Sequence, residues 1–221
     1  MSKNNPSSHK NLYYVFDPLC GWCYGAGATV AALSANPAFT LRALPSGLFA
    51  DSGGRRMDEA FASYAWSNDQ RIERLTGQPF SERYRSGVLA DFRQAFDSGP
   101  ATLALTAVAL TDPQAELQTL AVLQRARYVD GQDITRYDTL AALLQHSGLP
   151  QAAARLSAAD TDAELLELRR ARQTKAQALL QAHGARGVPA FILEHDGNRQ
   201  LLRTDAVYTD PQGFIDSLIA A

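Results

Sequence analysis

Cysteine is scarce in this chain, which has only Cys20 and Cys23 among its 221 residues. A small secreted scaffold stabilised by disulfides needs more cysteines at wider spacings. A bond between two cysteines this close in sequence closes a very short loop, so it adds little to stability. We therefore expect the two cysteines to have a chemical role rather than to stabilise the fold.

Metal ligands are also few. A structural zinc site needs four ligands, and the chain has no second CxxC motif. The four histidines are scattered along the sequence without the spacing of a metal site: His9, His146, His183 and His195. The sequence therefore predicts no bound metal.

Long apolar runs and an excess of one charge are missing too. No segment approaches the roughly 18 uninterrupted apolar residues of a membrane span. The formal net charge is −2 with both signs interspersed, so we expect neither a nucleic acid nor a membrane surface as partner. The polar start, Met1 to Lys10, lacks the apolar core of a signal peptide. These features favour a cytoplasmic protein.

The pattern of residues at the two ends of the chain predicts strands, and the middle predicts helices. Residues 11–16 and 39–44 are rich in β-formers, and the Ala-rich stretch from Cys20 to about Ala35 between them predicts a helix. Helical spacing then covers 57–75, 79–97 and several later segments up to about residue 183. A strand at 188–194, a hairpin partner at 199–204 and a helix from Pro211 close the chain. The order predicts an α/β protein with a helical block in the middle.

Cys20-Gly21-Trp22-Cys23 follows the first strand and begins a helix. In the first helical turn, residues i and i+3 share one face at a Cα separation of about 5 Å, which a disulfide tolerates. The unpaired N–H groups and positive dipole of a helix start favour the thiolate form of Cys20, and the thiolate is the nucleophile. Cys23, one turn further in, should be more buried and neutral. We predict Cys20 as the attacking thiol and Cys23 as the resolving thiol.

Asp17 lies three residues before Cys20. Its carboxylate could assist proton transfer to or from the cysteine pair. A simpler interpretation is a turn or capping residue ahead of the helix, because Asp-Pro commonly has that role. The sequence favours the second interpretation.

Three stretches of this sequence resemble the DsbA family of thioredoxin-like thiol–disulfide oxidoreductases. They are Phe16 to Gly25, Ser98 to Ala101, and Gly184 to Phe191. The resemblance extends in order over nearly the whole chain, and it is strongest to the cytoplasmic branch of FrnE-like proteins and predicted protein-disulfide isomerases. It implies a thioredoxin-like fold at residues 1–57 and 177–221, with an all-helical domain inserted at 58–176.

The resemblance also implies an activity and a substrate site. It implies a reductase or isomerase of protein disulfides that needs no bound cofactor. The bond between Val188 and Pro189 is expected to be cis and to lie against the CxxC motif, where the Val188 backbone can pair with an extended substrate. Trp22 and nearby aromatic residues are candidates for the floor of the substrate groove. Trp22 carries no charge that could stabilise the Cys20 thiolate. We therefore expect a more reducing redox potential than that of the strongly oxidising family members.

Two other functions fit the same pattern. Kappa-class glutathione transferases and chromene-carboxylate isomerases resemble this architecture, which makes glutathione a further candidate partner. Those enzymes typically lack the second cysteine, so Cys23 argues against this function. A non-catalytic peptide-binding module or chaperone is the second alternative. Substrate identity, the direction of electron flow and oligomeric state stay open.

Overall fold

The computed structural model of the protein describes residues 10–220. The polar N-terminal segment considered above therefore lies outside the described residues, except for Lys10. Within residues 10–220, none of the helices combines the length and apolar character that crossing a bilayer requires.

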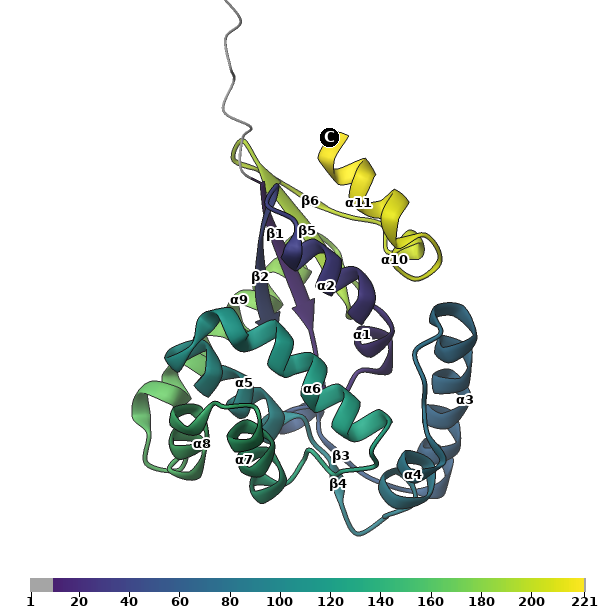
Figure 1. The fold of residues 1–221 in the computed structure, drawn as a ribbon, viewed down its shortest axis with the longest axis vertical. Coiled ribbons are helices and arrows are strands. Elements are labelled where there is room, and N and C mark those ends of the chain that lie inside the picture. The colour runs from purple at the N-terminus through teal and green to yellow at the C-terminus, as the bar shows by residue number, and fades with distance from the viewer. Residues whose placement is uncertain (1–9, 221) are drawn as a thin grey trace, which may run out of the picture.

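A four-stranded mixed sheet forms the centre of one half of the molecule (Figure 1). It is built from β1 (Lys10–Phe16), β2 (Phe39–Pro45), β5 (Ala190–His195) and β6 (Asn198–Leu201), in the order β2-β1-β5-β6. β1 is parallel to β2 and antiparallel to β5, which pairs with β6 through a tight hairpin. Strands from the two ends of the chain are thus neighbours, as the predicted α/β, thioredoxin-like fold requires.

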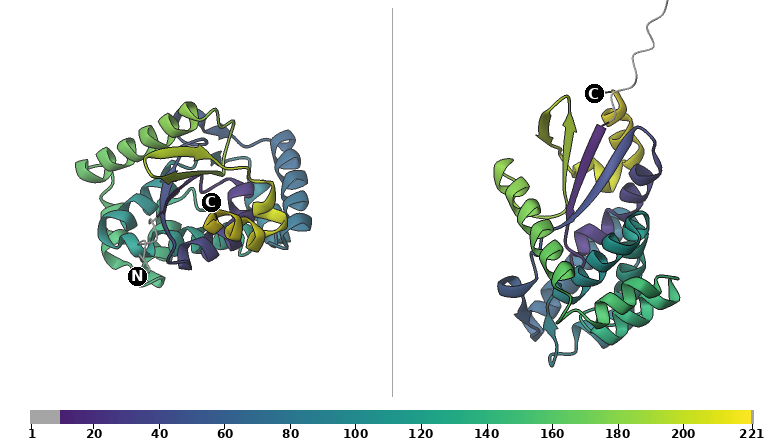
Figure 2. Two further views of the ribbon diagram at one scale, coloured as in Figure 1. Left: turned by 90° about the horizontal axis from the view of Figure 1, so that it is seen from above. Right: turned by 90° about the vertical axis from the view of Figure 1, so that its left-hand side faces the viewer.

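Both faces of this sheet are covered, and the alternation of β1 shows how. Leu12, Tyr14 and Phe16 belong to the main core, whereas Tyr13 and Val15 belong to a smaller cluster on the opposite face. Successive side chains of a strand point to opposite faces, so an uninterrupted apolar strand is what a sheet with two covered faces needs. Figure 2 shows helices on either side of the sheet.

Helices make up most of the rest of the chain. Those near the sheet are α1 (Gly21–Gly25), α2 (Gly27–Ala35), α9 (Ala163–Ala182), α10 (Asp205–Thr209) and α11 (Pro211–Ala220). The others are α3 (Glu59–Thr76), α4 (Glu82–Tyr84), α5 (Gly99–Thr111), α6 (Glu116–Tyr128), α7 (Tyr137–His146) and α8 (Pro150–Ser157). The helical middle predicted from the sequence is confirmed in outline.

Two local expectations were wrong. The single helix expected from Cys20 to Ala35 is divided at Ala26 into α1 and α2. Ala26 is flanked by Gly25 and Gly27, and glycine has a low helix propensity. The helix expected at 79–97 is instead the short α4, a π-helical turn at Arg85–Leu89 and a two-residue strand, β4 (Ala95–Phe96). β4 pairs with β3 (Arg55–Arg56), so tertiary pairing replaced the local helical pattern.

Helix α9 joins the sheet to the helical block. It crosses the domain boundary predicted at residue 177, and it contacts both β2 and α5. The buried Arg172 donates to the Ala43 carbonyl of β2 at 3.1 Å and forms an ion pair with Glu116 of α6. A guanidinium can satisfy partners in several directions at once, so this one side chain links three elements.

Candidate active site

Cys20 lies at the N-terminal end of α1, directly after the loop that leaves β1. It is the residue that caps α1, with extended backbone angles, and its N–H donates to the Asp17 carbonyl at 3.1 Å. Its side chain is only 7% exposed. The Cys20 thiol donates a weak hydrogen bond to the Val188 carbonyl at 3.5 Å. A loop 168 residues away in sequence is therefore in contact with the first cysteine.

The Val188 loop has the geometry that the family resemblance implies. The peptide bond between Val188 and Pro189 is cis. Pro189 is buried, and Val188 is half-buried. The two residues directly precede β5, which starts at Ala190 rather than at Val188 as expected. The Val188 backbone thus lies outside the sheet ladder and next to the Cys20 thiol.

Cys23 is fully buried one turn further along α1. Burial raises the pKa of its thiol far above the usual range, and the hydrogen bond and charge of Cys20 raise it further. The Tyr14 hydroxyl donates to the Cys23 carbonyl at 3.3 Å and holds this turn against the sheet. Neither cysteine is in a disulfide. The pair thus consists of an outer thiol near the surface and an inner, neutral thiol.

Asp17 is completely buried and bridges three segments. One carboxylate oxygen accepts from the Leu19 N–H at 2.9 Å. The other accepts from the Phe49 N–H at 3.1 Å and from the Ser98 hydroxyl at 2.8 Å. Burial raises the pKa of Asp17, although these hydrogen bonds oppose the rise. The bond to Leu19 is the local turn interaction that the sequence favours, and the bonds to Phe49 and Ser98 could not be read from it.

Trp22 lies partly exposed between the two cysteines. Its ring packs edge-on against Tyr208 at a centroid distance of 5.1 Å, and the Arg71 guanidinium lies 5.6 Å from its centroid. The neighbouring Tyr14, Tyr24 and Phe191 are buried in the core. Trp22, in contrast, lines an opening beside Cys20.

That opening, which we call the aromatic cleft, lies between α1 and α3 and has a volume of about 220 Å³. Cys20, Gly21 and Trp22 form one wall. The other walls are mainly apolar and aromatic, and include Phe49, Phe61, Tyr64, Phe96 and Tyr128. Asp69 also lines the cleft, although the sequence offered no sign of it. This composition suits an apolar group of a substrate beside the Cys20 sulfur, and Asp69 adds one acidic side chain to the lining.

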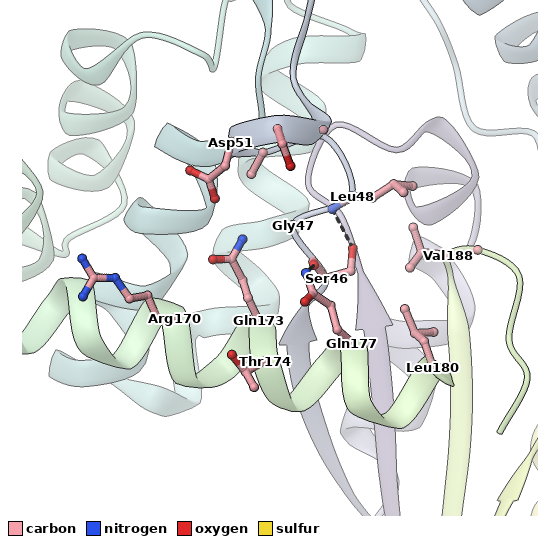
Figure 3. A pocket seen from close by; sticks show the side chains of 14 residues that line it. Ser46, Gly47, Leu48, Asp51, Arg170, Gln173, Thr174, Gln177, Leu180 and Val188 are labelled. Atoms are coloured by element: carbon pink, nitrogen blue, oxygen red, sulfur yellow. Dashed lines mark hydrogen bonds between the residues drawn. The ribbon is translucent and has the colours of Figure 1, made fainter. Parts of the chain in front are cut away.

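A second opening, the polar cleft, lies on the Val188 side of Cys20 and has a volume of about 420 Å³ (Figure 3). Helix α9 forms its floor and the loop at residues 46–53 forms its roof. Gln173 and Gln177 point from the helix towards that loop, and the Gln177 amide donates to the Ser46 carbonyl at 3.2 Å. Arg170 and Thr174 add a cation and a hydroxyl. This cleft therefore suits a polar ligand rather than an apolar one.

Across residues 10–220, no group of three or more acidic, histidine or cysteine side chains is placed to hold a metal ion. The groups that the structure places at the site include the two thiols, the buried carboxyl groups of Asp17 and Asp69, and the Val188 backbone.

Comparison with known proteins agrees with this geometry. The profile of the DSBA-like thioredoxin domain matches residues 12–210. The chain belongs to this family. It is a DsbA-like thiol–disulfide oxidoreductase with a thioredoxin-like fold.

Solved structures place this DsbA-like protein among disulfide oxidoreductases. The cytosolic disulfide reductase DsbM from Pseudomonas aeruginosa is 33% identical, with a TM-score of 0.84 over 95% of this chain and 98% of that chain. DsbM with glutathione is 31% identical, with a TM-score of 0.82 over 96% and 100%. A candidate protein disulfide isomerase from Nitrosomonas europaea shares the fold at 21% identity, with a TM-score of 0.75 over 96% and 98%. No curated protein matches the chain by sequence.

Proposed function

We propose that this DsbA-like protein reduces or isomerises protein disulfides in the cytoplasm, with Cys20 as the attacking thiol and Cys23 as the resolving thiol. The observation that carries the proposal is the position of the Cys20 sulfur, 3.5 Å from the Val188 carbonyl, in front of the buried Cys23. The similarity to a cytosolic disulfide reductase supports both the direction and the compartment, because structural disulfides are rare in the cytoplasm.

The reaction proceeds by two exchanges of sulfur partners. The Cys20 thiolate attacks one sulfur of a substrate disulfide; a bond forms from Cys20 to that sulfur, the substrate S–S bond breaks, and the other sulfur leaves as a thiolate that then takes up a proton. Cys23 then loses its proton and attacks Cys20, which releases the second substrate thiol and leaves a Cys20–Cys23 disulfide. Two electrons pass to the substrate. Isomerisation follows when a substrate thiol, instead of Cys23, attacks the mixed disulfide.

Substrate binding is assigned to Trp22, Val188 and Pro189. The Val188 backbone lies free of the β5 ladder beside the Cys20 sulfur, so an extended peptide can pair with it through main-chain hydrogen bonds. Proline at 189 has no N–H that could compete for that peptide or for the sulfur. Trp22 supplies apolar surface on the other side of Cys20.

Asp17 is a candidate for proton transfer with Cys23. Its carboxyl group is buried, and its charge is among the influences that raise the pKa of the Cys23 thiol. The Cys23 proton must leave when the mixed disulfide is resolved, and a buried carboxylate with a raised pKa can accept it. This role adds to the turn interaction that Asp17 makes with Leu19.

Glutathione is the proposed reducing partner. The structure of DsbM with glutathione supports this choice, and the polar cleft offers groups that fit a small, charged peptide. Arg170 can pair with a carboxylate, and Gln173 and Thr174 can bind amide groups. One glutathione thiolate would attack the Cys20–Cys23 disulfide and form a mixed disulfide, and a second would attack the glutathione sulfur of that bond, which releases oxidised glutathione and returns the enzyme to its dithiol form. Cys23 argues for this role over that of a glutathione transferase.

The domain arrangement predicted from the sequence is retained as part of the proposal. Residues 1–57 and 177–221 would carry the redox chemistry, and residues 58–176 would cover the aromatic cleft. α3 and α6 both belong to the second group of residues, and they supply Asp69 and Tyr128 to that cleft.

An insulin-reduction assay with glutathione and the Cys20→Ser variant tests the function. We expect the wild type to reduce insulin and the variant to lose at least about 99% of that activity, because the nucleophile is absent. Cys23→Ser should instead accumulate a mixed disulfide that non-reducing electrophoresis and mass spectrometry detect. Reduction that persists in Cys20→Ser, or an unreactive wild type, would rule out the proposal.

A further inference from the structure

Asp69 is a buried carboxyl group beside the reactive cysteine that the mechanism above does not use. It lies on α3, in the inserted part of the chain, and is 4% exposed. Its side chain lines the aromatic cleft together with Cys20 and Gly21. The contact with Gly21 is close, since a Cβ atom added at Gly21 would lie 2.5 Å from the Asp69 Oδ1. One oxygen of this carboxyl group is thus directed at the redox motif itself.

The second oxygen of Asp69 is held in place from the other side. The Tyr84 hydroxyl donates to Oδ2 at 3.0 Å. The buried Arg127 lies behind Tyr84, with its guanidinium 5.4 Å from the Tyr84 ring centroid. Tyr84 and Arg127 lower the pKa of Asp69, but burial outweighs them and raises it to about 7. Near neutral pH, this carboxyl group is therefore present in both protonated and ionised forms.

The first exchange step creates a need for such a group. When the Cys20 thiolate attacks, the distal sulfur of the substrate leaves with a negative charge. The aromatic cleft beside Cys20 is lined mainly by apolar side chains, and an unpaired charge in apolar surroundings is unfavourable. An alkyl thiol has a pKa of about 8.5, so a carboxyl group with a pKa of about 7 would transfer its proton to the leaving thiolate downhill.

We propose that Asp69 is the general acid for the leaving thiol of the substrate in the first exchange step. The proposal rests on the proposed disulfide reductase function. The Cys20–substrate bond forms, the substrate S–S bond breaks, and the distal sulfur takes the proton of Asp69. The resulting carboxylate is stabilised by the Tyr84 hydroxyl and regains a proton from water. In the oxidising direction, the same carboxylate removes the proton of a substrate thiol.

The groups around Asp69 define the expected pH dependence. Cys20 at the start of α1, Tyr84 of α4 and Tyr128 of α6 line the same cleft as Asp69, and Arg127 of α6 lowers the pKa of Asp69. Tyr208 of α10 packs on Trp22 on the same side of α1. Burial raises the pKa values of Tyr84, Tyr128 and Tyr208 above the ordinary tyrosine value of about 10, so they stay neutral near pH 7. Arginine stays charged. Asp69 is therefore the group of this set whose raised pKa lies near 7.

A comparison of leaving groups tests the proposal. The kcat/KM of wild type, Asp69→Asn and the control Glu59→Gln would be measured with an aliphatic disulfide peptide and with an aryl disulfide. An aryl thiolate is stable without protonation because the ring delocalises its charge, so it gains little from a general acid. We expect Asp69→Asn to lose about tenfold or more with the peptide at pH 6 and less than about twofold with the aryl disulfide. Glu59, an exposed residue of the same helix, should have no effect with either substrate.

The pH profile supplies a second readout. The ratio of wild-type to Asp69→Asn kcat/KM for the peptide should fall towards one as the pH rises through about 7, because Asp69 loses its proton. Tyr84→Phe removes a hydrogen bond that lowers the pKa of Asp69, so in this variant the fall of kcat/KM towards the Asp69→Asn value should move to higher pH. If Asp69→Asn does not fold, the shift of the pH profile in Tyr84→Phe still tests the proposal.

The outcomes separate this proposal from the one on which it rests. A wild type without disulfide reductase activity overturns the proposed function. An active wild type, with both substrates slowed equally by Asp69→Asn at every pH, shows a structural role and overturns the general acid. So does unchanged peptide reduction by Asp69→Asn, or a pH profile that Tyr84→Phe does not move.

Discussion

At the scale of single residues, the two cysteines differ because their surroundings differ. Cys20 caps a helix and touches the Val188 carbonyl, whereas Cys23 lies inside the core. The low dielectric of the core disfavours a charged sulfur, which is the physical reason that the pKa of Cys23 is raised. This difference supports the proposed roles, in which Cys20 is the attacking thiol and Cys23 the resolving thiol.

Trp22 leads to a prediction about the redox potential. It places no charge next to Cys20, whereas a histidine cation there would stabilise the thiolate and hence the reduced enzyme. We expect a potential clearly more reducing than the roughly −120 mV of a strong oxidant, and we expect Trp22→His to raise it. Equilibration with buffers of known ratio of reduced to oxidised glutathione measures the redox potential of both proteins. A wild-type potential near −120 mV would contradict the prediction.

Asp17 leads to a prediction about the second exchange step. Asp17→Asn removes the proton acceptor proposed for Cys23, which slows release of the mixed disulfide. It also removes a negative charge that raises the pKa of Cys23, but burial is a larger cause of that raised pKa and is unchanged in the variant. We therefore expect net slowing, by about tenfold or more, in single-turnover measurements.

The control for Asp17→Asn is Ser98→Ala. This variant removes one hydrogen bond to the Asp17 carboxylate and leaves the carboxylate in place. It should change the rate of release far less than Asp17→Asn does. Equal rates in the two variants would show that Asp17 acts by packing alone.

At the scale of elements, the contact between α1 and α3 decides the shape of the aromatic cleft. Glycines at 21 and 25, one helical turn apart, allow α3 to approach closely. A Cβ atom at Gly25 would lie 2.6 Å from the Ile72 Cγ2. Ile72 is 1% exposed and β-branched, so it has little freedom to move away.

Gly25→Ala tests this contact. Alanine is the better helix former by about 1 kcal/mol, but overpacking at a buried site costs about 1–3 kcal/mol. We expect the clash to dominate and the variant to unfold at lower denaturant concentration. Gly87→Ala is the matched control, because the nearest atom to a Cβ there is a carbonyl oxygen at 3.8 Å. Equal stability of the two variants would contradict the prediction.

At the scale of the whole molecule, buried carboxyl groups link stability to pH. Burial raises the pKa values of Asp17 and Asp69 in the folded state. In the unfolded chain both should titrate near their ordinary pKa of about 3.9. Between the unfolded and folded values, the folded protein binds more protons than the unfolded chain. The free energy of unfolding must therefore fall as the pH rises through this window.

For Asp69 the upper end of this pH window is defined, since burial raises its pKa in the folded protein to about 7. We expect the free energy of unfolding to decrease between pH 4 and pH 7.5 by up to about 4 kcal/mol from this residue. Asp69→Asn should flatten that decrease, as urea unfolding at several pH values would measure. A slope that is unchanged in the variant would contradict the prediction.

The four main strands in their order along the chain, the redox motif and its place at a strand–helix junction could all be predicted from the sequence. Each depends on residues close together in the chain, where alternation, helical spacing and proline restrict the backbone. The region at 79–97 shows the limit, because its helical pattern gave way to pairing between β3 and β4. A strand of two residues is too short to leave a periodic signal.

The sequence by itself determined which atoms can react: a CxxC pair at the start of a helix, with Asp17 beside it. Only the tertiary structure decided what surrounds them. It brought the Val188 carbonyl to Cys20 across 168 residues and packed Asp69 against Gly21. Such contacts depend on how whole elements pack in the core, and the burial that this packing creates raises the pKa values of Asp17, Cys23 and Asp69.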